Sequence, residues 1–203
     1  MELVQAWLEQ VTLSPWLYPV LFVLVVADAF LVVLPSETFV VALGSLAIST
    51  GSPSLGLVLA VATAGAIVGD NLCYLIGRRI GTERFRWMRR PRIASAIGYA
   101  RSALTRRPAS LILTARYIPF ARIAANLTAG ATGFDYRRYL PLTVIAGASW
   151  AVYNCLVGAI FGAWLRDNPV LAIVLSVVVA ISLGIAIDTI AARVTALRSS
   201  RRG

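Results

Sequence analysis

The sequence predicts an all-α polytopic membrane protein with two re-entrant, broken helical hairpins of opposite orientation. Of the 203 residues, 59% are hydrophobic and only 14% are charged, which is less charge than a water-soluble domain of this length carries. Several apolar runs approach or exceed the roughly 20 residues that cross the hydrocarbon core of a bilayer. These runs cover residues 16–34, 53–77, 139–165 and 169–192. Pro35 and Pro119 each interrupt an apolar stretch. Because the apolar runs take up much of the chain and leave no room for a separate soluble domain, we expect residues 1–203 to form a single membrane domain.

Residues 1–14 are predicted to form a helix on the membrane surface. Leu3, Trp7 and Val11 recur at helical spacing and give the segment one apolar face. The segment contains glutamates and no basic residue, so we do not expect a cleavable signal peptide.

Residues 16–49 are predicted to form the first hairpin, with its break at Pro35. Proline cannot donate to the helical hydrogen-bond ladder, and it disfavours helix in the preceding residue. The arm that follows, residues 38–49, is too short to cross a bilayer. A turn then leads into residues 53–77, which are long enough for a transmembrane helix.

Residues 78–107 form an arginine-rich segment that we place in the cytoplasm, because cytoplasmic loops carry an excess of basic residues. The second hairpin, residues 108–133, is broken at Pro119 and has arms of about ten residues, again too short to cross.

The predicted transmembrane helices 137–165 and 169–192 follow, and residues 193–203 form a basic tail. Arg166 is the only basic residue in the connection between these helices, so the positive-inside rule places the C-terminal tail in the cytoplasm of a bacterial inner membrane. The rule leaves the side of Met1 open.

In this orientation the first hairpin enters from outside and the second from the cytoplasm, which makes them an inverted pair. Each is followed, at a near-equal distance, by a helix that ends in G-x-x-x-G, with glycines at 77 and 81 and at 158 and 162. Small residues at this spacing allow close helix packing. The motif fits packing inside the chain and also a homodimer.

Composition excludes several kinds of function. The absence of histidine removes histidine catalysis and histidine metal ligands, and Cys73 and Cys155 have no metal-site or disulfide spacing. We expect neither a metal nor another cofactor. The 19 basic residues are all arginine, with a net charge of +10, and they cluster beside apolar runs. Anionic lipid headgroups are therefore the expected partner, rather than nucleic acid.

The predicted site consists of Glu37, Asp70, Arg116 and Arg122, because charges at membrane depth are costly and are functional candidates by default. Glu37 follows the first proline break, and the arginines flank Pro119. Opposed hairpins bring their tips together near the middle of the membrane. We therefore expect a polar cavity in which the carboxylates face two guanidinium groups suited to a phosphate. The carboxylates would hold the arginines in an empty site, or take up protons.

Asp28 and Asp188 are predicted to lie outside this site, and Asp188 is close enough to Arg193 for an interfacial ion pair. Tyr74 shares a helical stripe with Asp70, so its hydroxyl is expected to reach the cavity or to lie at the membrane interface. The alternative for the charges is a static salt-bridge cluster that fixes the fold.

Short motifs also carry a resemblance to a known family. They are L-P-S-E at 34–37, G-D-N-L-C-Y-L-I-G-R-R-I-G at 69–81, R-Y-I-P-F-A-R at 116–122 and A-G at 129–130. In these motifs the chain closely resembles the DedA family, over roughly residues 15–165. The resemblance implies two re-entrant hairpins with transmembrane helices. It also implies movement of undecaprenyl phosphate or phospholipid between leaflets, in some members with dependence on the proton gradient.

The resemblance further implies that the family's essential acidic and arginine positions correspond to Glu37, Asp70, Arg116 and Arg122. Gly130 belongs to the last motif and is expected to support the site. Where the family often has glycine after the hairpin proline, this chain has Phe120.

The leading hypothesis is a flippase- or scramblase-like lipid transporter, not an enzyme, that passes a phosphate headgroup through the cavity between the hairpins. Membrane lipids are its expected partners, and proton coupling is left open. A membrane phosphatase for polyprenyl diphosphate is one alternative, although the chain has no histidine nucleophile. A proton or ion transporter is another.

Overall fold

The computed structural model describes residues 12, 14–31, 36–82, 91–165, 171, 173–175, 177–179 and 182. In these ranges the regular elements are all helices, as the sequence predicts. The chain divides into two compact units. The first comprises Met1–Ser36 and Leu59–Val152, and the second comprises Glu37–Val58 and Tyr153–Gly203.

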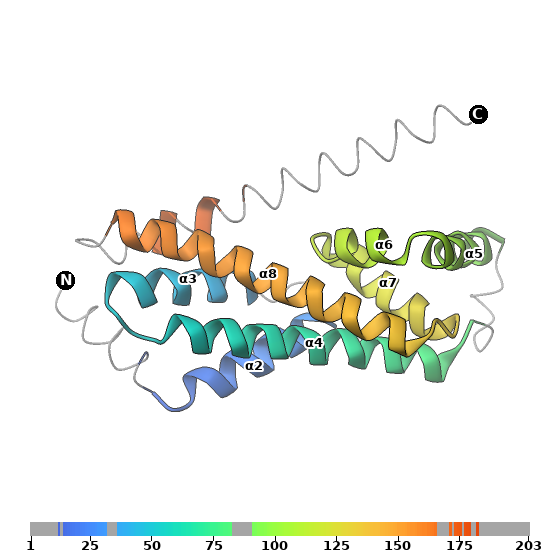
Figure 1. Cartoon of the computed structure of the whole chain (residues 1–203), viewed down its shortest axis with the longest axis horizontal. Coiled ribbons are helices and arrows are strands. Elements are labelled where there is room, and N and C mark those ends of the chain that lie inside the picture. The colour runs from blue at the N-terminus through green and yellow to red at the C-terminus, as the bar shows by residue number, and fades with distance from the viewer. Residues whose placement is uncertain are drawn as a thin grey trace. The chain divides into compact units, whose positions relative to one another are not determined.

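The two longest helices are α4 (Leu55–Ile80) and α8 (Tyr136–Trp164). Both are long and apolar enough to cross a membrane, which agrees with the predicted spans 53–77 and 137–165. Within the first unit they cross each other, and Gly147 of α8 lies against Ala66 of α4 (Figure 1).

Proline positions set the starts of the helices between them. The helices α5 (Pro91–Arg106), α6 (Pro108–Ala115) and α7 (Pro119–Ala131) each begin with proline, whose missing N–H costs nothing in the first turn. The chain is extended at Ile118, between α6 and α7. This confirms the predicted break at Pro119. At about 12 Å and 20 Å, neither arm reaches the roughly 30 Å of a hydrocarbon core.

The first hairpin breaks earlier than the sequence predicts. Its first helix, α2, spans Leu17–Asp28 and ends before Pro35 is reached. The expected arm 16–34 is therefore wrong in its end point, and α2 is only about 18 Å long. The second arm is α3 (Ser36–Ser49), which agrees with the predicted short helix.

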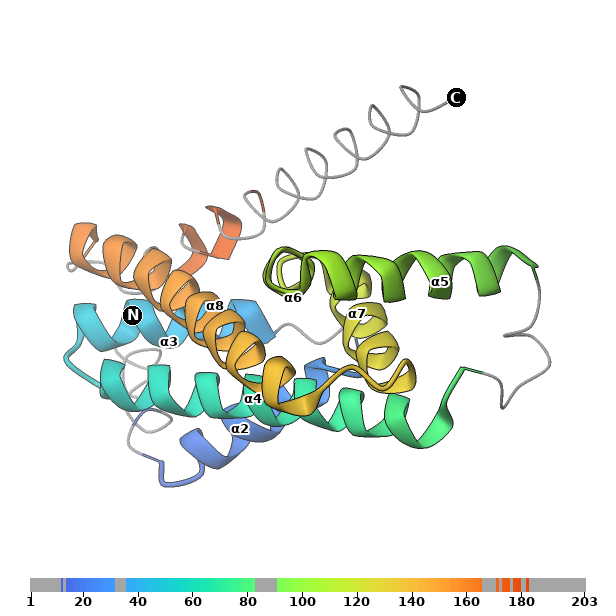
Figure 2. The same ribbon diagram turned by 45° about the vertical axis from the view of Figure 1, so that its right-hand side comes forward.

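In each unit the second arm of a hairpin packs on a long helix at glycines. In the first unit α7 lies on α4 (Figure 2), and a methyl group added at Gly77 or Gly130 would overlap the facing backbone. In the second unit α3 lies on α8, where Gly158 and Gly162 meet the α3 backbone in the same way. These contacts support the predicted internal repeat. Gly81 differs, because it ends α4 with φ +69° and faces open space.

Some predictions lie outside the described residues. These are the surface helix 1–14 apart from Thr12 and Ser14, Pro35, Asp188, most of the span 169–192, and the tail 193–203. Insertion of the hairpins into a bilayer, the orientation of the chain and its treatment as one domain stay predictions.

Candidate functional site

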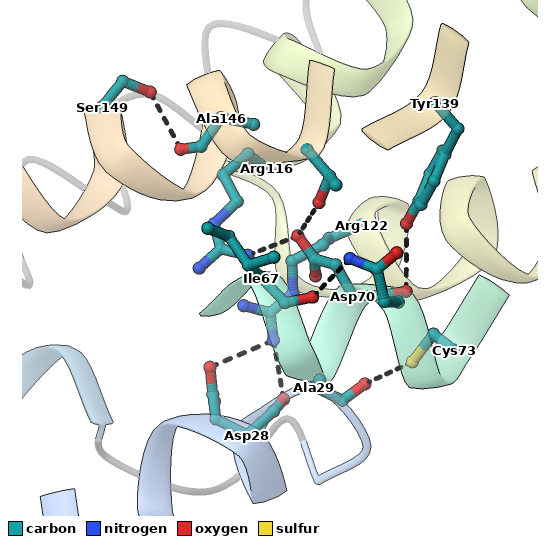
Figure 3. A network of polar contacts seen from close by, with 12 residues as sticks. Asp28, Ala29, Ile67, Asp70, Cys73, Arg116, Arg122, Tyr139, Ala146 and Ser149 are labelled. Atoms are coloured by element: carbon teal, nitrogen blue, oxygen red, sulfur yellow. Dashed lines mark hydrogen bonds and ion pairs between the residues drawn. The ribbon is translucent and has the colours of Figure 1, made fainter. Parts of the chain in front are cut away.

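Two buried ion pairs occupy the middle of the first unit (Figure 3). Asp70 of α4 pairs with Arg116 at 2.7 Å, and Asp28 at the end of α2 pairs with Arg122 of α7 at 3.0 Å. All four residues are buried, with Asp70 and Arg116 only 3% exposed. Burying charges is expensive unless each has a partner in good geometry, so the pairing itself follows from the depth of the site.

The Asp70 carboxylate is held on one oxygen only. Its Oδ2 accepts from Arg116 Nη1 and, at 3.1 Å, from the Thr143 hydroxyl of α8. The Tyr139 hydroxyl, also from α8, donates to the Asp70 main-chain carbonyl at 3.0 Å. In the described part of the chain, the buried Asp70 Oδ1 has no hydrogen-bond partner. The carboxylate thus keeps capacity to accept a further hydrogen bond or a proton.

Arg116 lies at the break of the second hairpin, as the residue that caps α6. Its guanidinium carbon lies 4.8 Å from the centroid of the Trp150 ring, a cation–π distance. The next residue, Tyr117, hydrogen-bonds through its hydroxyl to Ser149, so the break is anchored to α8 through both Arg116 and Tyr117. The Nε and Nη2 groups of Arg116 are buried and have no hydrogen-bond partner among the residues that the structure describes. They form one edge of the guanidinium, which is the edge that binds two oxygens at once.

Arg122 is bonded differently. Its Nη2 donates to the Asp28 main-chain carbonyl at 2.6 Å and to the Asp28 carboxylate at 3.0 Å. Beside it, the Cys73 thiol of α4 donates to the Ala29 carbonyl at 3.2 Å. Main-chain carbonyls at the end of α2 are therefore bonded by side chains from two other helices, as Figure 3 shows.

The cluster as a whole is electrically balanced, with two arginines against two aspartates. An unpaired guanidinium edge fits two oxygens of an anionic group, such as a phosphate or a carboxylate. Among the described residues there is no group of three potential metal ligands.

The structure brings together part of the predicted site. Asp70 and Arg116 are paired as expected, and Arg122 lies in the same cluster. Glu37 lies in the first turn of α3 and belongs to the other unit, and its side chain is exposed. The exclusion of Asp28 was wrong, because Asp28 is the carboxylate that pairs with Arg122. No signal in the sequence identified this pairing, because Glu37 and Asp70 already offered one carboxylate for each of the two arginines.

The structure places the predicted supporting residues Tyr74, Gly130 and Pro119 in different roles. Tyr74 is fully buried, its hydroxyl donates to the Phe134 carbonyl, and its ring stacks on Tyr139 at 4.5 Å. Tyr74 therefore braces the α7–α8 connection, and its hydroxyl bonds to Phe134 and Arg78 rather than to the carboxylates. Gly130 supports the site as a close-packing position against the backbone of Tyr74. Pro119 supports it by starting α7, three residues before Arg122.

Comparison with known proteins gives the family. The VTT-domain profile matches residues 34–160, well over half of the chain. The chain is 29% identical over 181 residues to Protein DedA of Escherichia coli K12, covering 84% of this chain and 81% of that protein. It is 32% identical over 167 residues to the uncharacterized membrane protein Rv2637 of Mycobacterium tuberculosis H37Rv, covering 75% and 74%. The inner membrane protein YohD of E. coli K12 is 26% identical over 129 residues, covering 62% and 66%.

No solved structure matches the chain. The three relatives are named as DedA or as membrane proteins, and none of these names is that of an enzyme. The profile match contains Asp70 and both arginines of the cluster, whereas Asp28 lies before it. The chain belongs to the DedA family of VTT-domain membrane proteins.

Proposed function

We propose that this protein moves a phosphate-bearing lipid, undecaprenyl phosphate or a phospholipid, across the bacterial inner membrane. The observation that carries the proposal is the unpaired Nε and Nη2 edge of Arg116, buried beside Asp70. A buried donor without a partner costs about 1–3 kcal/mol, and more when it is charged. An edge of this kind is therefore a natural site for an anionic ligand, and two phosphate oxygens match its geometry.

An apolar hollow along α2 supports a lipid rather than a free phosphate. It has a volume of about 440 Å³ and is lined by Trp16, Pro19, Val20, Val23, Leu24 and Ala27. Asp28, which follows Ala27, belongs to the buried face of the same helix. A hydrocarbon tail against α2 would match apolar with apolar surface, and a phosphate at the arginines would match anion with cation.

Charge balance supports coupling to protons. The cluster is neutral when empty, so a bound phosphate would leave a net negative charge in a buried site. Protonation of the Asp70 carboxylate would restore neutrality and would also release Arg116 Nη1 toward the ligand. Glu37 stays a proposed second carboxylate for proton exchange, at the start of α3.

Translocation of a fluorescent undecaprenyl phosphate analogue in proteoliposomes tests the proposal. The wild-type protein should move the analogue between leaflets, and Arg116→Gln should slow this at least about tenfold, the effect of losing about 1.4 kcal/mol of binding. Arg101→Gln is the matched control, because Arg101 is an exposed arginine of α5. Equal rates for Arg116→Gln and the wild type would contradict the assignment of the site.

The same preparation separates the rival functions. Release of inorganic phosphate from undecaprenyl diphosphate would indicate a phosphatase. Proton or ion flux in liposomes that lack the lipid substrate would indicate an ion transporter. We expect neither activity.

A further inference from the structure

The two arginines of the cluster differ in which of their guanidinium N–H groups have hydrogen-bond partners. Arg116 uses only Nη1 for its aspartate, and its Nε and Nη2 are unpaired. Arg122 uses both hydrogens of Nη2 on one residue, Asp28, with one bond to the carboxylate and one to the main-chain carbonyl. The Nε and Nη2 edge is thus unpaired at both atoms in Arg116, whereas in Arg122 the Nη2 end is used by Asp28 and only Nε has no hydrogen-bond partner among the described residues.

Arg122 also satisfies a structural need at the end of α2. The last carbonyls of a helix have no partner within the helix, and a buried carbonyl requires one. A cation at this end is further favoured by the helix dipole. The Asp28 carbonyl meets this need through Arg122, since α2 ends there and Asp28 is only 8% exposed.

Two contacts from α4 fix the same point. The Cys73 thiol donates to the Ala29 carbonyl, and Gly69 lies so close to Ala29 that a Cβ on Gly69 would be only 2.7 Å from the Ala29 Cβ. The end of α2 is therefore held by α7 through Arg122 and by α4 through Cys73 and Gly69. We refer to this set, Asp28, Ala29, Gly69, Cys73 and Arg122, as the α2 joint.

We propose that Asp28 is a positioning residue: it holds Arg122 across the end of α2 and thereby fixes the break of the first hairpin. Arg116 is then the arginine that contacts the phosphate. The second statement rests on the proposed lipid transport, whereas the first stands on the geometry of the joint alone. Asp28 lies before the profile match, which begins at residue 34.

Cys73 provides a native reporter of the joint. Its side chain is buried and bonded within the joint, and Cys155, the other cysteine, is removed by Cys155→Ala. In this background the rate of Cys73 modification by a membrane-permeant maleimide measures how often the joint opens. Asp28→Asn keeps the size of the side chain but removes its charge, and should raise the rate at least about tenfold, a cost of about 1.4 kcal/mol. Asp28→Glu, which keeps the charge, should stay closer to the parent rate.

Arg116→Lys is the discriminating control, because it changes the other arginine of the same cluster. It should leave Cys73 protected while raising the lipid concentration for half-maximal transport. Asp28→Asn should instead lower the maximal transport rate and change that concentration by less than about twofold, since its contact is with Arg122 and not with the lipid. Arg122→Lys gives a second test of the joint should Asp28→Asn not yield monodisperse protein, because an ammonium lacks the planar fork.

The inference fails if Cys73 reacts at the parent rate in both Asp28→Asn and Arg122→Lys, or if Arg116→Lys exposes Cys73 as strongly as these variants do. If the wild-type protein transports no lipid but the variants show the expected Cys73 rates, the proposed function is contradicted. The positioning role of Asp28 in the α2 joint is then still supported.

Discussion

Arg116 donates to Asp70 through Nη1 alone, at 2.7 Å, and its remaining edge is buried without a partner. A pair that served only to fix the fold would be expected to use the bidentate geometry available to arginine and carboxylate. The single bond leaves unused donors on one partner and an unused acceptor, Oδ1, on the other. In the proposed function, the unused donors of Arg116 would bind the ligand, and the carboxylate of Asp70 would accept the proton.

Asp70→Asn should destabilise the empty protein, because it leaves the buried Arg116 charge without its partner. Breaking a buried pair on one side costs about 3–5 kcal/mol. Thermal unfolding in detergent should show a clear fall in Tm. Thr143→Val removes only a neutral hydrogen bond to the same carboxylate and should cost about 1 kcal/mol. A Tm for Asp70→Asn no lower than that of Thr143→Val would count against a charged pair at this position.

Binding of the phosphate lipid should be accompanied by proton uptake. The neutral cluster gains a negative charge with the ligand, and a buried site compensates such a charge rather than leaving it unpaired. A pH indicator in weakly buffered detergent solution should report about one proton taken up per lipid bound, and Asp70→Asn should abolish the signal. Stoichiometric binding without any pH change would remove the proposed proton coupling and leave the phosphate contact untouched.

Gly130→Ala should lower stability through a steric clash rather than through the site. A Cβ at this position would overlap the Tyr74 carbonyl and the Arg78 amide of α4, so α7 must shift. Overpacking of this kind costs about 1–3 kcal/mol. The control is Gly98→Ala in α5, where a Cβ meets nothing within 4 Å and helix propensity favours alanine. Thermal unfolding should therefore show a lower Tm for Gly130→Ala and an equal or higher Tm for Gly98→Ala.

Tyr74→Phe should reduce stability without impairing transport. The variant keeps the ring that stacks on Tyr139 and loses the hydroxyl that bonds Phe134 and Arg78, at a cost of about 1 kcal/mol. Transport at saturating lipid should match the wild type, since the hydroxyl makes no bond to either carboxylate. A selective loss of transport with unchanged Tm would place Tyr74 in the transport site after all.

The sequence predicts the parts of this fold that local rules determine. The chemistry of proline predicts the break before α7, and the length of the apolar runs predicts α4 and α8. The cost of burying charge predicts that Asp70 and Arg116 pair. The end of α2 could not be found in this way, because nothing local in the residues after Asp28 stops a helix before Pro35. The end is set by Arg122, Cys73 and the close approach of Gly69, which are contacts between distant segments.

The sequence did not predict the hydrogen-bond partners of Asp28 and Tyr74, and the physical reason is the same for both. Asp28 became a partner of Arg122 only because α2 ends beside it, so its exclusion followed from the wrong helix end. For Tyr74, the helical stripe gave the correct face of α4 but not the reach of the side chain, whose hydroxyl extends to the α7–α8 connection. Periodicity identifies the face of a helix, whereas partners depend on how other helices pack against that face.

The most direct test is a density map of the purified protein in nanodiscs that contain undecaprenyl phosphate. The account predicts phosphate density within hydrogen-bond distance of Arg116 Nε and Nη2, with Arg122 still bonded to Asp28. A map of lipid-loaded, transport-active protein in which the Arg116 edge is filled by water or by another side chain would contradict it.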